Sequence, residues 1–241
     1  MFAAFMNDYQ ELIATVTRAN ESDWSYLDLI GEWRRKHFIK IAKLFDSFVT
    51  VITETKDYNT ACSIIRMIYD NWYSYAFIYL CTHGEERLLR YYLFVIDSIN
   101  QRKKTMLNLN DDDQIDTAIK QQADKTIQDC NKAKQHYINL IYKLSLYPQH
   151  IKFINMAIEK GCWQYKELLG EKPARYKWCE LYELLSGKDT RAFLEYLSQY
   201  IHGLYISTLT IVPSNEEMGC VFHEALRLVK SINIHLKDNP L

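Results

Sequence analysis

The stretch NTACSIIRMIYDNWYSYAFIYLCT, residues 59–82, is apolar on nearly every side of a helix and carries two formal charges, Arg66 and Asp70. A helix of this kind is either the central helix of a globular protein or a membrane span. An asparagine, a serine and several tyrosines in the uncharged run after Asp70 disfavour the span. The pattern therefore predicts a central helix, with Gly84 placed to stop it.

The composition of the whole chain favours helices throughout. Of 241 residues, 48% are hydrophobic and 24% charged, enough to bury a sizeable core. Seven glycines and four prolines are too few for the turns of a β-sandwich or barrel, or for a Rossmann fold. A formal net charge of −1 excludes a generally basic coat, so nonspecific nucleic-acid binding is not expected.

Apolar residues at three- and four-residue steps predict helices along the rest of the chain. The expected ranges are 2–18, 22–55, 85–104, 115–144, 149–159, 162–169, 174–186, 189–209 and 214–236, with a loop at 108–113. Residues 148–187 would thus hold several short helices. Because no long linker interrupts the pattern, we predict an all-α, multi-helix bundle of seven to ten helices that forms a single domain over residues 1–241.

The cysteines and the N-terminus indicate a compartment. Six cysteines are spread along the chain without a CxxC pair, which favours reduced, buried thiols. Asp8 follows the first apolar residues too early for a signal peptide, so a cytoplasmic protein is expected. The basic run Arg34-Arg35-Lys36 is interpreted as a solvated helix face.

Arg66 and Asp70 stand four residues apart, on one face of the predicted central helix. A buried, unpaired charge costs several kcal/mol, so each needs a partner. One carboxylate cannot use all five donors of a guanidinium, and other polar groups must converge there. The pair is then either a structural ion pair that sets helix register or the floor of a site.

A second polar stripe lies near the C-terminus. Arg191, Glu195, Ser198 and His202 step by four, three and four residues along one helix face. The first two are expected to form a solvated pair, whereas Ser198 and His202 have more apolar surroundings. We therefore expect Ser198 and His202 to complete the polar surroundings of the earlier arginine and aspartate.

These motifs carry a resemblance to a known group. The segment Arg66-Met-Ile-Tyr-Asp70 resembles the R-x3-E/D signature of HEPN-like helical proteins, and more narrowly that of a bacterial family of that kind. The same family has an aromatic segment and a late S-x3-H-G helix, similar to Tyr176-Lys-Trp178 and Ser198-Gln-Tyr-Ile-His202-Gly203. The resemblance covers about residues 40–210. It implies a helical bundle in which arginine, acid, serine and histidine meet in the interior.

The chain departs from the ribonucleases of that group, which use R-x4–6-H. No arginine here stands at that distance before a histidine, and Asp70 replaces the commoner glutamate. No metal-ligating histidine or cysteine spacing, phosphate loop or hydrolase elbow is present either, so no metal or cofactor is expected. Eighteen tyrosines are interpreted mainly as core and groove lining, although aromatic rings also suit base stacking.

The candidate site residues are Arg66, Asp70, Ser198 and His202. The first hypothesis is a non-enzymatic binding or interaction module, in which Arg66 and His202 bind an anionic group or hold the bundle in shape. The resemblance adds a bacterial stress or defence setting and a homodimer, for which the 115–144 helix offers a surface. The alternative is a metal-independent ribonuclease or phosphodiesterase, with His202 as general acid/base and Arg66 stabilising phosphate charge.

Overall fold

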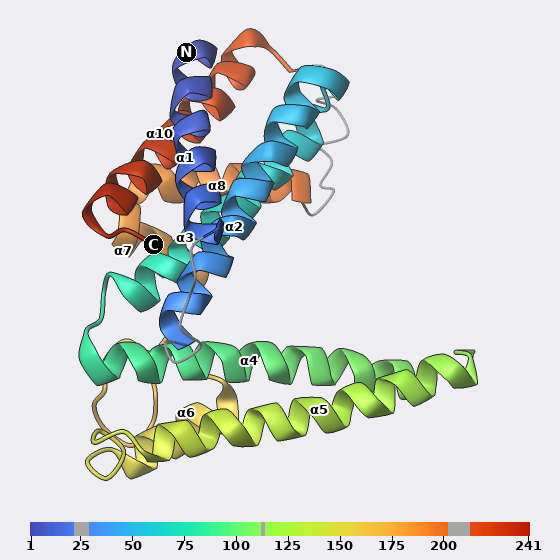
Figure 1. The fold of residues 1–241 in the computed structure, drawn as a ribbon, viewed down its shortest axis with the longest axis vertical. Helices are drawn as coiled ribbons and strands as arrows, with labels where there is room; N and C mark the ends of the chain where they lie inside the picture. Colours follow the sequence, from blue (N-terminus) through green and yellow to red (C-terminus); the bar gives the residue numbers. More distant parts are fainter. Residues whose placement is uncertain (22–28, 112–113, 202–212) are drawn as a thin grey trace. The chain divides into compact units, whose positions relative to one another are not determined.

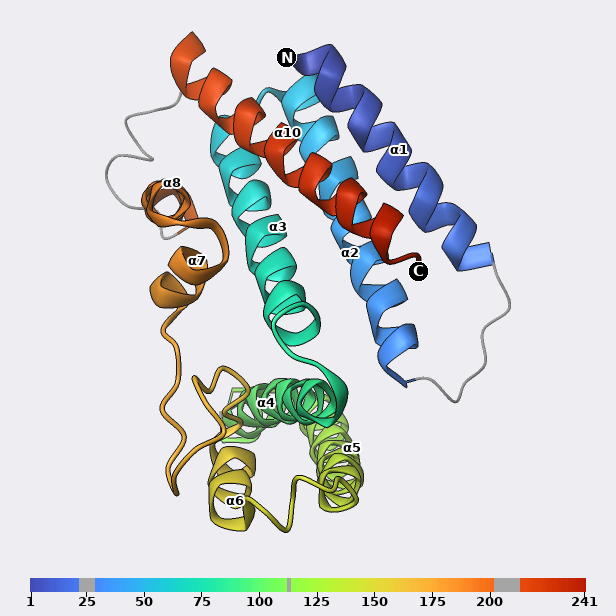
Figure 2. The same ribbon diagram turned by 90° about the vertical axis from the view of Figure 1, so that its left-hand side faces the viewer.

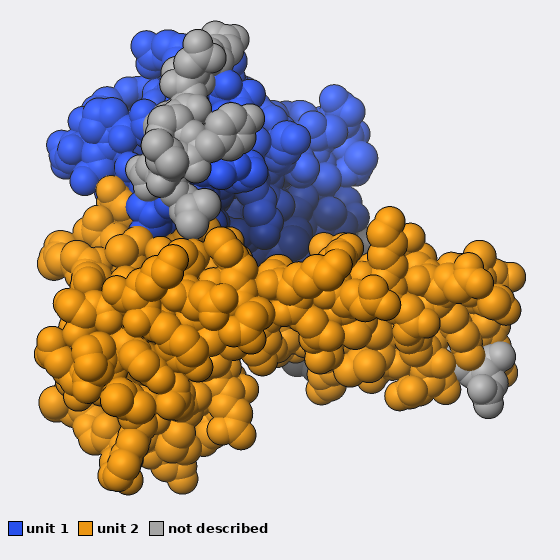
Figure 3. Space-filling view, turned by 60° about the horizontal axis from the view of Figure 1, so that its bottom comes forward, with its two compact units in different colours: residues 1–77, 181–241 blue, residues 78–180 orange. Residues whose placement is uncertain are grey.

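A computed structural model describes residues 1–21, 29–111, 114–201 and 213–241. Over these ranges the chain forms nine α-helices and a short π-helix, with no β-strand, which confirms the predicted all-α, multi-helix fold. Contacts divide the chain into two compact units (Figure 3). Unit 1 comprises residues 1–77 and 181–241, and unit 2 comprises residues 78–180. The single domain over residues 1–241 stays a prediction.

Unit 1 is a helical bundle around α3 (Figures 1 and 2). Its helices are α1 (Phe2–Glu21), α2 (Leu29–Thr50), α3 (Tyr58–Tyr79, to residue 77), most of α7 (Trp178–Ser186), α8 (Lys188–Ile201) and α10 (Asn215–Asp238). Figure 2 shows α1, α2, α3 and α10 side by side, with α7 and α8 next to α3. The predicted central helix is therefore confirmed within unit 1, where most of its side chains are buried.

The basic run on α2 differs from its prediction. Arg34 is buried, with 9% of its surface exposed. Its guanidinium donates to the Tyr75 hydroxyl at 3.1 Å and to the backbone carbonyls of Asn239 and Pro240 at 3.0 and 3.4 Å. The predicted solvated face was thus wrong for Arg34, which is buried. The three oxygens replace the water that its charge loses on burial.

Unit 2 is built on a long antiparallel hairpin of α4 (Gly84–Asn110) and α5 (Thr117–Tyr142), with α6 (Ile151–Lys160) beside it (Figure 1). Asp116 caps α5 by accepting from the Ala118 amide at 2.7 Å. After α6, Gly161 adopts a left-handed conformation, and a Cβ there would lie 3.0 Å from the Cα of Asp97. Glycine is thus required both by the turn and by the close approach to α4.

The predicted helix over 162–169 was wrong. The segment instead pairs with a later stretch of backbone: Tyr176 donates to the Gln164 carbonyl and Lys166 to the Ala174 carbonyl, each at 2.8 Å. Because of this pairing, the helix predicted over 174–186 begins later in the sequence, as α7 at Trp178. Backbone groups engaged in distant pairing are not available for a helix ladder.

Several helix ends differ by a few residues from their predicted positions. Gly84 begins α4 rather than ending α3, and α4 continues to Asn110 through part of the predicted 108–113 loop. The π-helix (Val51–Thr55) follows α2. The capping box of Ser214 and Glu217 starts α10 close to the predicted position. The beginning of the 22–55 helix and the end of the 189–209 helix lie outside the described residues.

Among the helices described, none is long and apolar enough to cross a membrane. All six cysteines are free. Cys62, Cys130 and Cys162 are buried as expected, but Cys81 and Cys220 are exposed.

Candidate functional site

The predicted pair of Arg66 and Asp70 forms on α3. Arg66 Nε donates to Asp70 Oδ2 at 3.3 Å. The arginine side chain is 13% exposed and the aspartate side chain 37% exposed, so the pair lies at the edge of the unit 1 core. One turn later, the Ser74 hydroxyl donates to the Asp70 backbone carbonyl at 2.8 Å.

Tyr182 of α7 joins the two charged groups, and sequence reasoning missed it. Its hydroxyl donates to Asp70 Oδ1 at 2.6 Å and accepts a short hydrogen bond from Arg66 Nη2. The guanidinium carbon also lies 4.7 Å from the centre of the tyrosine ring, in cation–π geometry. Burial, with a further contribution from Asp70, raises the pKa of Tyr182 above its usual range. The phenol therefore stays neutral and acts as the donor.

Ser198 meets the pair through a shared acceptor on α8. Arg66 Nη1 donates to the Leu194 carbonyl at 2.9 Å, and the Ser198 hydroxyl donates to the same oxygen at 2.8 Å. The structure thus brings Arg66, Asp70 and Ser198 into one group, completed by Tyr182 and called here the Arg66 cluster. The fourth candidate, His202, lies outside the described residues.

The signal that could have identified Tyr182 is weak. The family resemblance placed its aromatic segment at Tyr176 and Trp178, whereas the ring that stacks on Arg66 is that of Tyr182, further along the chain. In a chain with eighteen tyrosines, one more in an amphipathic helix is read as core. Only the demand of Arg66 for acceptors pointed to an unnamed polar partner.

A neighbouring group, called here the Arg227 cluster, joins α3, α8 and α10. Arg227 Nε donates to Glu224 Oε2 at 2.8 Å. Its Nη2 donates to the Tyr69 hydroxyl at 2.9 Å and to Thr190 Oγ1 at 2.8 Å. The Tyr69 hydroxyl in turn donates to Glu224 in a short hydrogen bond. Its residues are spread over three distant segments, so no local sequence pattern marks this group.

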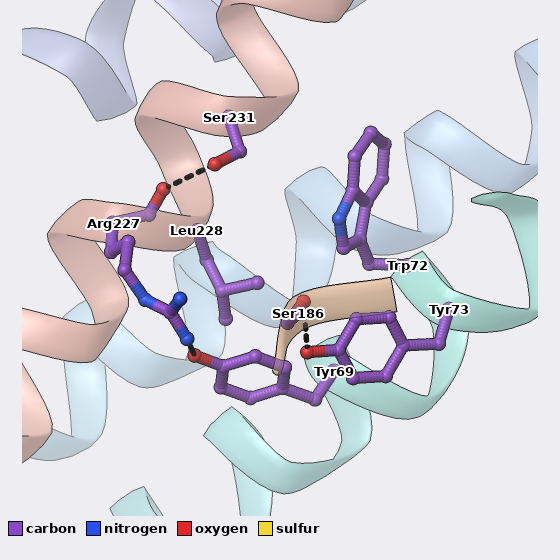
Figure 4. A pocket seen from close by; sticks show the side chains of 7 residues that line it. All are labelled: Tyr69, Trp72, Tyr73, Ser186, Arg227, Leu228 and Ser231. Atoms are coloured by element: carbon purple, nitrogen blue, oxygen red, sulfur yellow. Dashed lines mark hydrogen bonds between the residues drawn. The ribbon is translucent and has the colours of Figure 1, made fainter. Parts of the chain in front are cut away.

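The Arg227 cluster borders a small pocket of about 30 Å³ (Figure 4). The Tyr73 hydroxyl shares a 2.7 Å hydrogen bond with Ser186 Oγ on its wall. Trp72 and Leu228 supply apolar surface. All of these residues belong to unit 1.

Neither cluster has the composition of a metal centre. No group of three or more histidine, cysteine or acidic residues with metal-binding geometry is present in the described parts of the chain. What the Arg66 cluster offers chemically is a neutral phenol, one carboxylate and one guanidinium, all bonded to one another. Such a group can tie helices together through charge-assisted hydrogen bonds.

Comparison with known proteins adds no relative: no family model, curated protein or solved structure matches the chain. The HEPN-like relationship therefore stays a prediction from the motifs.

Proposed function

We propose that this chain is a non-enzymatic helical binding or interaction module, and that the Arg66 cluster holds its bundle in shape. The main support is the bonding of the Arg66 guanidinium. Nε donates to Asp70, Nη1 to the Leu194 carbonyl and Nη2 to Tyr182, so each of its three nitrogens already has a protein acceptor. A phosphate at Arg66 would have to displace or share these partners.

The ribonuclease alternative asks Arg66 to stabilise developing phosphate charge. Catalytic groups of that kind are preorganised with donors aimed at the reacting atoms. Here Nε is aimed at Asp70 and the other two nitrogens at α7 and α8, and the ring of Tyr182 lies against the guanidinium. The geometry therefore favours positioning of helices over catalysis. An anionic group held between Arg66 and His202 stays a prediction.

The proposal also covers the kind of organism and the compartment in which the module acts. The motifs, but no match to a known protein, suggest a HEPN-like bundle from a bacterial stress or defence locus, acting in the cytoplasm. The homodimer implied by the same resemblance would use the helix expected over 115–144, now α5. Sedimentation velocity over a range of protein concentrations tests for it.

A cleavage assay separates the module from the enzyme. Labelled single-stranded and hairpin RNAs are incubated with EDTA and with wild-type, His202→Ala or His136→Ala protein. His136 is an exposed histidine of α5 and provides the matched control. We expect no cleavage by any of the three proteins. Cleavage by wild type and His136→Ala, lost in a folded His202→Ala variant, would contradict the proposal and support the ribonuclease.

A further inference from the structure

The pocket beside the Arg227 cluster has hydrogen-bond donors that the described residues leave unused. Arg227 Nε and Nη2 are bonded to Glu224, Tyr69 and Thr190, which fixes the orientation of the guanidinium. Nη1 has no acceptor within the described ranges. The Arg227 side chain is 40% exposed, so a ligand can reach it from solvent.

The second unused donor belongs to a hydroxyl pair. Tyr73 donates to Ser186 Oγ, and Thr190 lies beside the same phenol as a second hydrogen-bonding neighbour. The unused O–H proton is that of Ser186, which donates to no residue in the described ranges. Figure 4 shows this pair and the Arg227–Tyr69 contact around the same pocket, with Leu228 between them.

The size of the pocket limits what these donors hold. Its volume is about 30 Å³, roughly twice the ~10–15 Å³ that one water-sized group needs. Two such positions suit the two oxygens of a carboxylate, whereas a phosphate carries four.

We propose that this pocket binds a carboxylate group, with Arg227 Nη1 and the Ser186 hydroxyl as its donors. Glu224 is the counter-charge of Arg227, at 2.7 Å from it, and makes the cluster neutral overall. Binding of a free carboxylate is therefore weak, with a Kd on the order of 1–10 mM for acetate. This site is independent of the role proposed for the Arg66 cluster.

Nuclear magnetic resonance titration with acetate tests the proposal. The reporters are the Arg227 Nε–H, held by its bond to Glu224, and the indole N–H of Trp72 in the pocket wall. Arg227→Lys and Trp72→Phe variants assign the two signals. We expect saturable shifts with sodium acetate and none with acetamide, or with sodium chloride or phosphate at the same ionic strength.

Two variants test the donors, so that the proposal stays testable if one of them does not fold. Arg227→Gln abolishes the saturable shift of Trp72 if the protein folds. Ser186→Ala keeps every bond of Arg227 and weakens acetate binding at least threefold. Arg191→Gln is the matched control, since Arg191 is 41% exposed and paired with glutamates in the same unit, and it leaves binding unchanged.

Equal shifts with acetate and acetamide would overturn the proposal, as would shifts that do not saturate or that persist unchanged in a folded Arg227→Gln or Ser186→Ala variant. The pocket would then hold water only. Blocked tripeptides with a central aspartate or asparagine identify the source of the carboxylate. Tighter binding of the aspartate peptide than of acetate indicates an acidic side chain of a protein partner, and the reverse order indicates a small carboxylic acid.

Discussion

Each unit contains an arginine held in the same way, half-buried in unit 1 and buried in unit 2. In unit 1, Arg66 pairs with Asp70 four residues later, stacks on Tyr182 and donates to a carbonyl of α8. In unit 2, Arg90 pairs at 3.2 Å with Glu86, four residues earlier, and its guanidinium carbon lies 3.9 Å from the Tyr165 ring centre. Arg90 Nη1 also donates to the carbonyls of Trp163 and Tyr165, at 3.3 and 3.0 Å.

The repetition bears on the meaning of the R-x3-D motif. An arginine, an acid one turn away, an aromatic ring and a distant carbonyl together attach a segment far along the chain to a helix. Arg90 does this for the loop around residues 163–165, which has no element of the proposed site. Unit 2 builds this structural cluster from the reverse order, Glu86-x3-Arg90, so an arginine and an acid one turn apart are weak support for catalysis at Arg66.

The two clusters differ at the tyrosine. The Tyr182 hydroxyl is bonded to both Asp70 and Arg66. The Tyr165 hydroxyl is buried and has no hydrogen-bond partner in the part of the chain that the structure describes. The phenol is thus hydrogen-bonded to both charged groups in unit 1, whereas in unit 2 it lies beside Glu86 and Arg90 without such a bond.

Removing either arginine gives the largest expected effect. Arg66→Met leaves Asp70 and the Leu194 carbonyl with fewer donors, and Arg90→Met leaves two buried carbonyls without theirs. We expect each to lower the free energy of unfolding by about 3 kcal/mol, the lower end for broken buried pairs, because each acid is more than a third exposed. Urea unfolding measures the loss.

Hydrogen exchange then tests whether the two clusters act separately. Arg66→Met should raise exchange in α7 and α8, and Arg90→Met in residues 162–177. Arg191→Met, at a solvated ion-pair site, serves as the control and should change stability by less than about 0.5 kcal/mol. An Arg66→Met protein as stable as wild type would contradict the holding role of the Arg66 cluster.

The contrast also explains what the sequence could predict. Arg66 and Asp70 were identified because they are the only charges in residues 59–82. Arg90 stands among Glu85, Glu86 and Arg87, where a charge is read as a solvated face. Its role was invisible, and so was the consequence that 162–169 is not a helix. Helix periodicity reports which face is buried, but not which distant carbonyl competes for a donor.

Acid should destabilise unit 1 more than unit 2, which is the next largest expected effect. Burial lowers the pKa of His37 to about 4, and burial together with Arg34 lowers that of His235 to about 4. Both histidines belong to unit 1. In the unfolded chain these histidines bind protons below about pH 6.5. Their contribution to the free energy of unfolding is therefore fully present above that pH and is lost as the pH drops toward 4. The His37 shift corresponds to about 3 kcal/mol at pH 4.

Urea unfolding at pH 7 and pH 5, followed by hydrogen exchange of peptides from each unit, measures this loss. Unit 1 peptides should lose protection first. His37→Gln and His235→Gln should each flatten the pH dependence, whatever they cost at pH 7. An identical slope between pH 7 and pH 5 in wild type and both variants would show that these histidines are not buried in their neutral form.

The smallest expected effect isolates the one difference between the two clusters. Tyr182→Phe removes a hydroxyl bonded to both charges of the Arg66 cluster and should cost about 1.5 kcal/mol, the low end for hydrogen bonds to charged groups, since water can reach Asp70. Tyr165→Phe removes a buried hydroxyl without a partner, so stability should stay within about 0.5 kcal/mol of wild type or rise. Both substitutions keep the ring that stacks on the arginine, so packing cancels between them. Urea unfolding of the two variants side by side measures the difference, and equal losses would mean that the Tyr182 hydroxyl does not join the charges of unit 1.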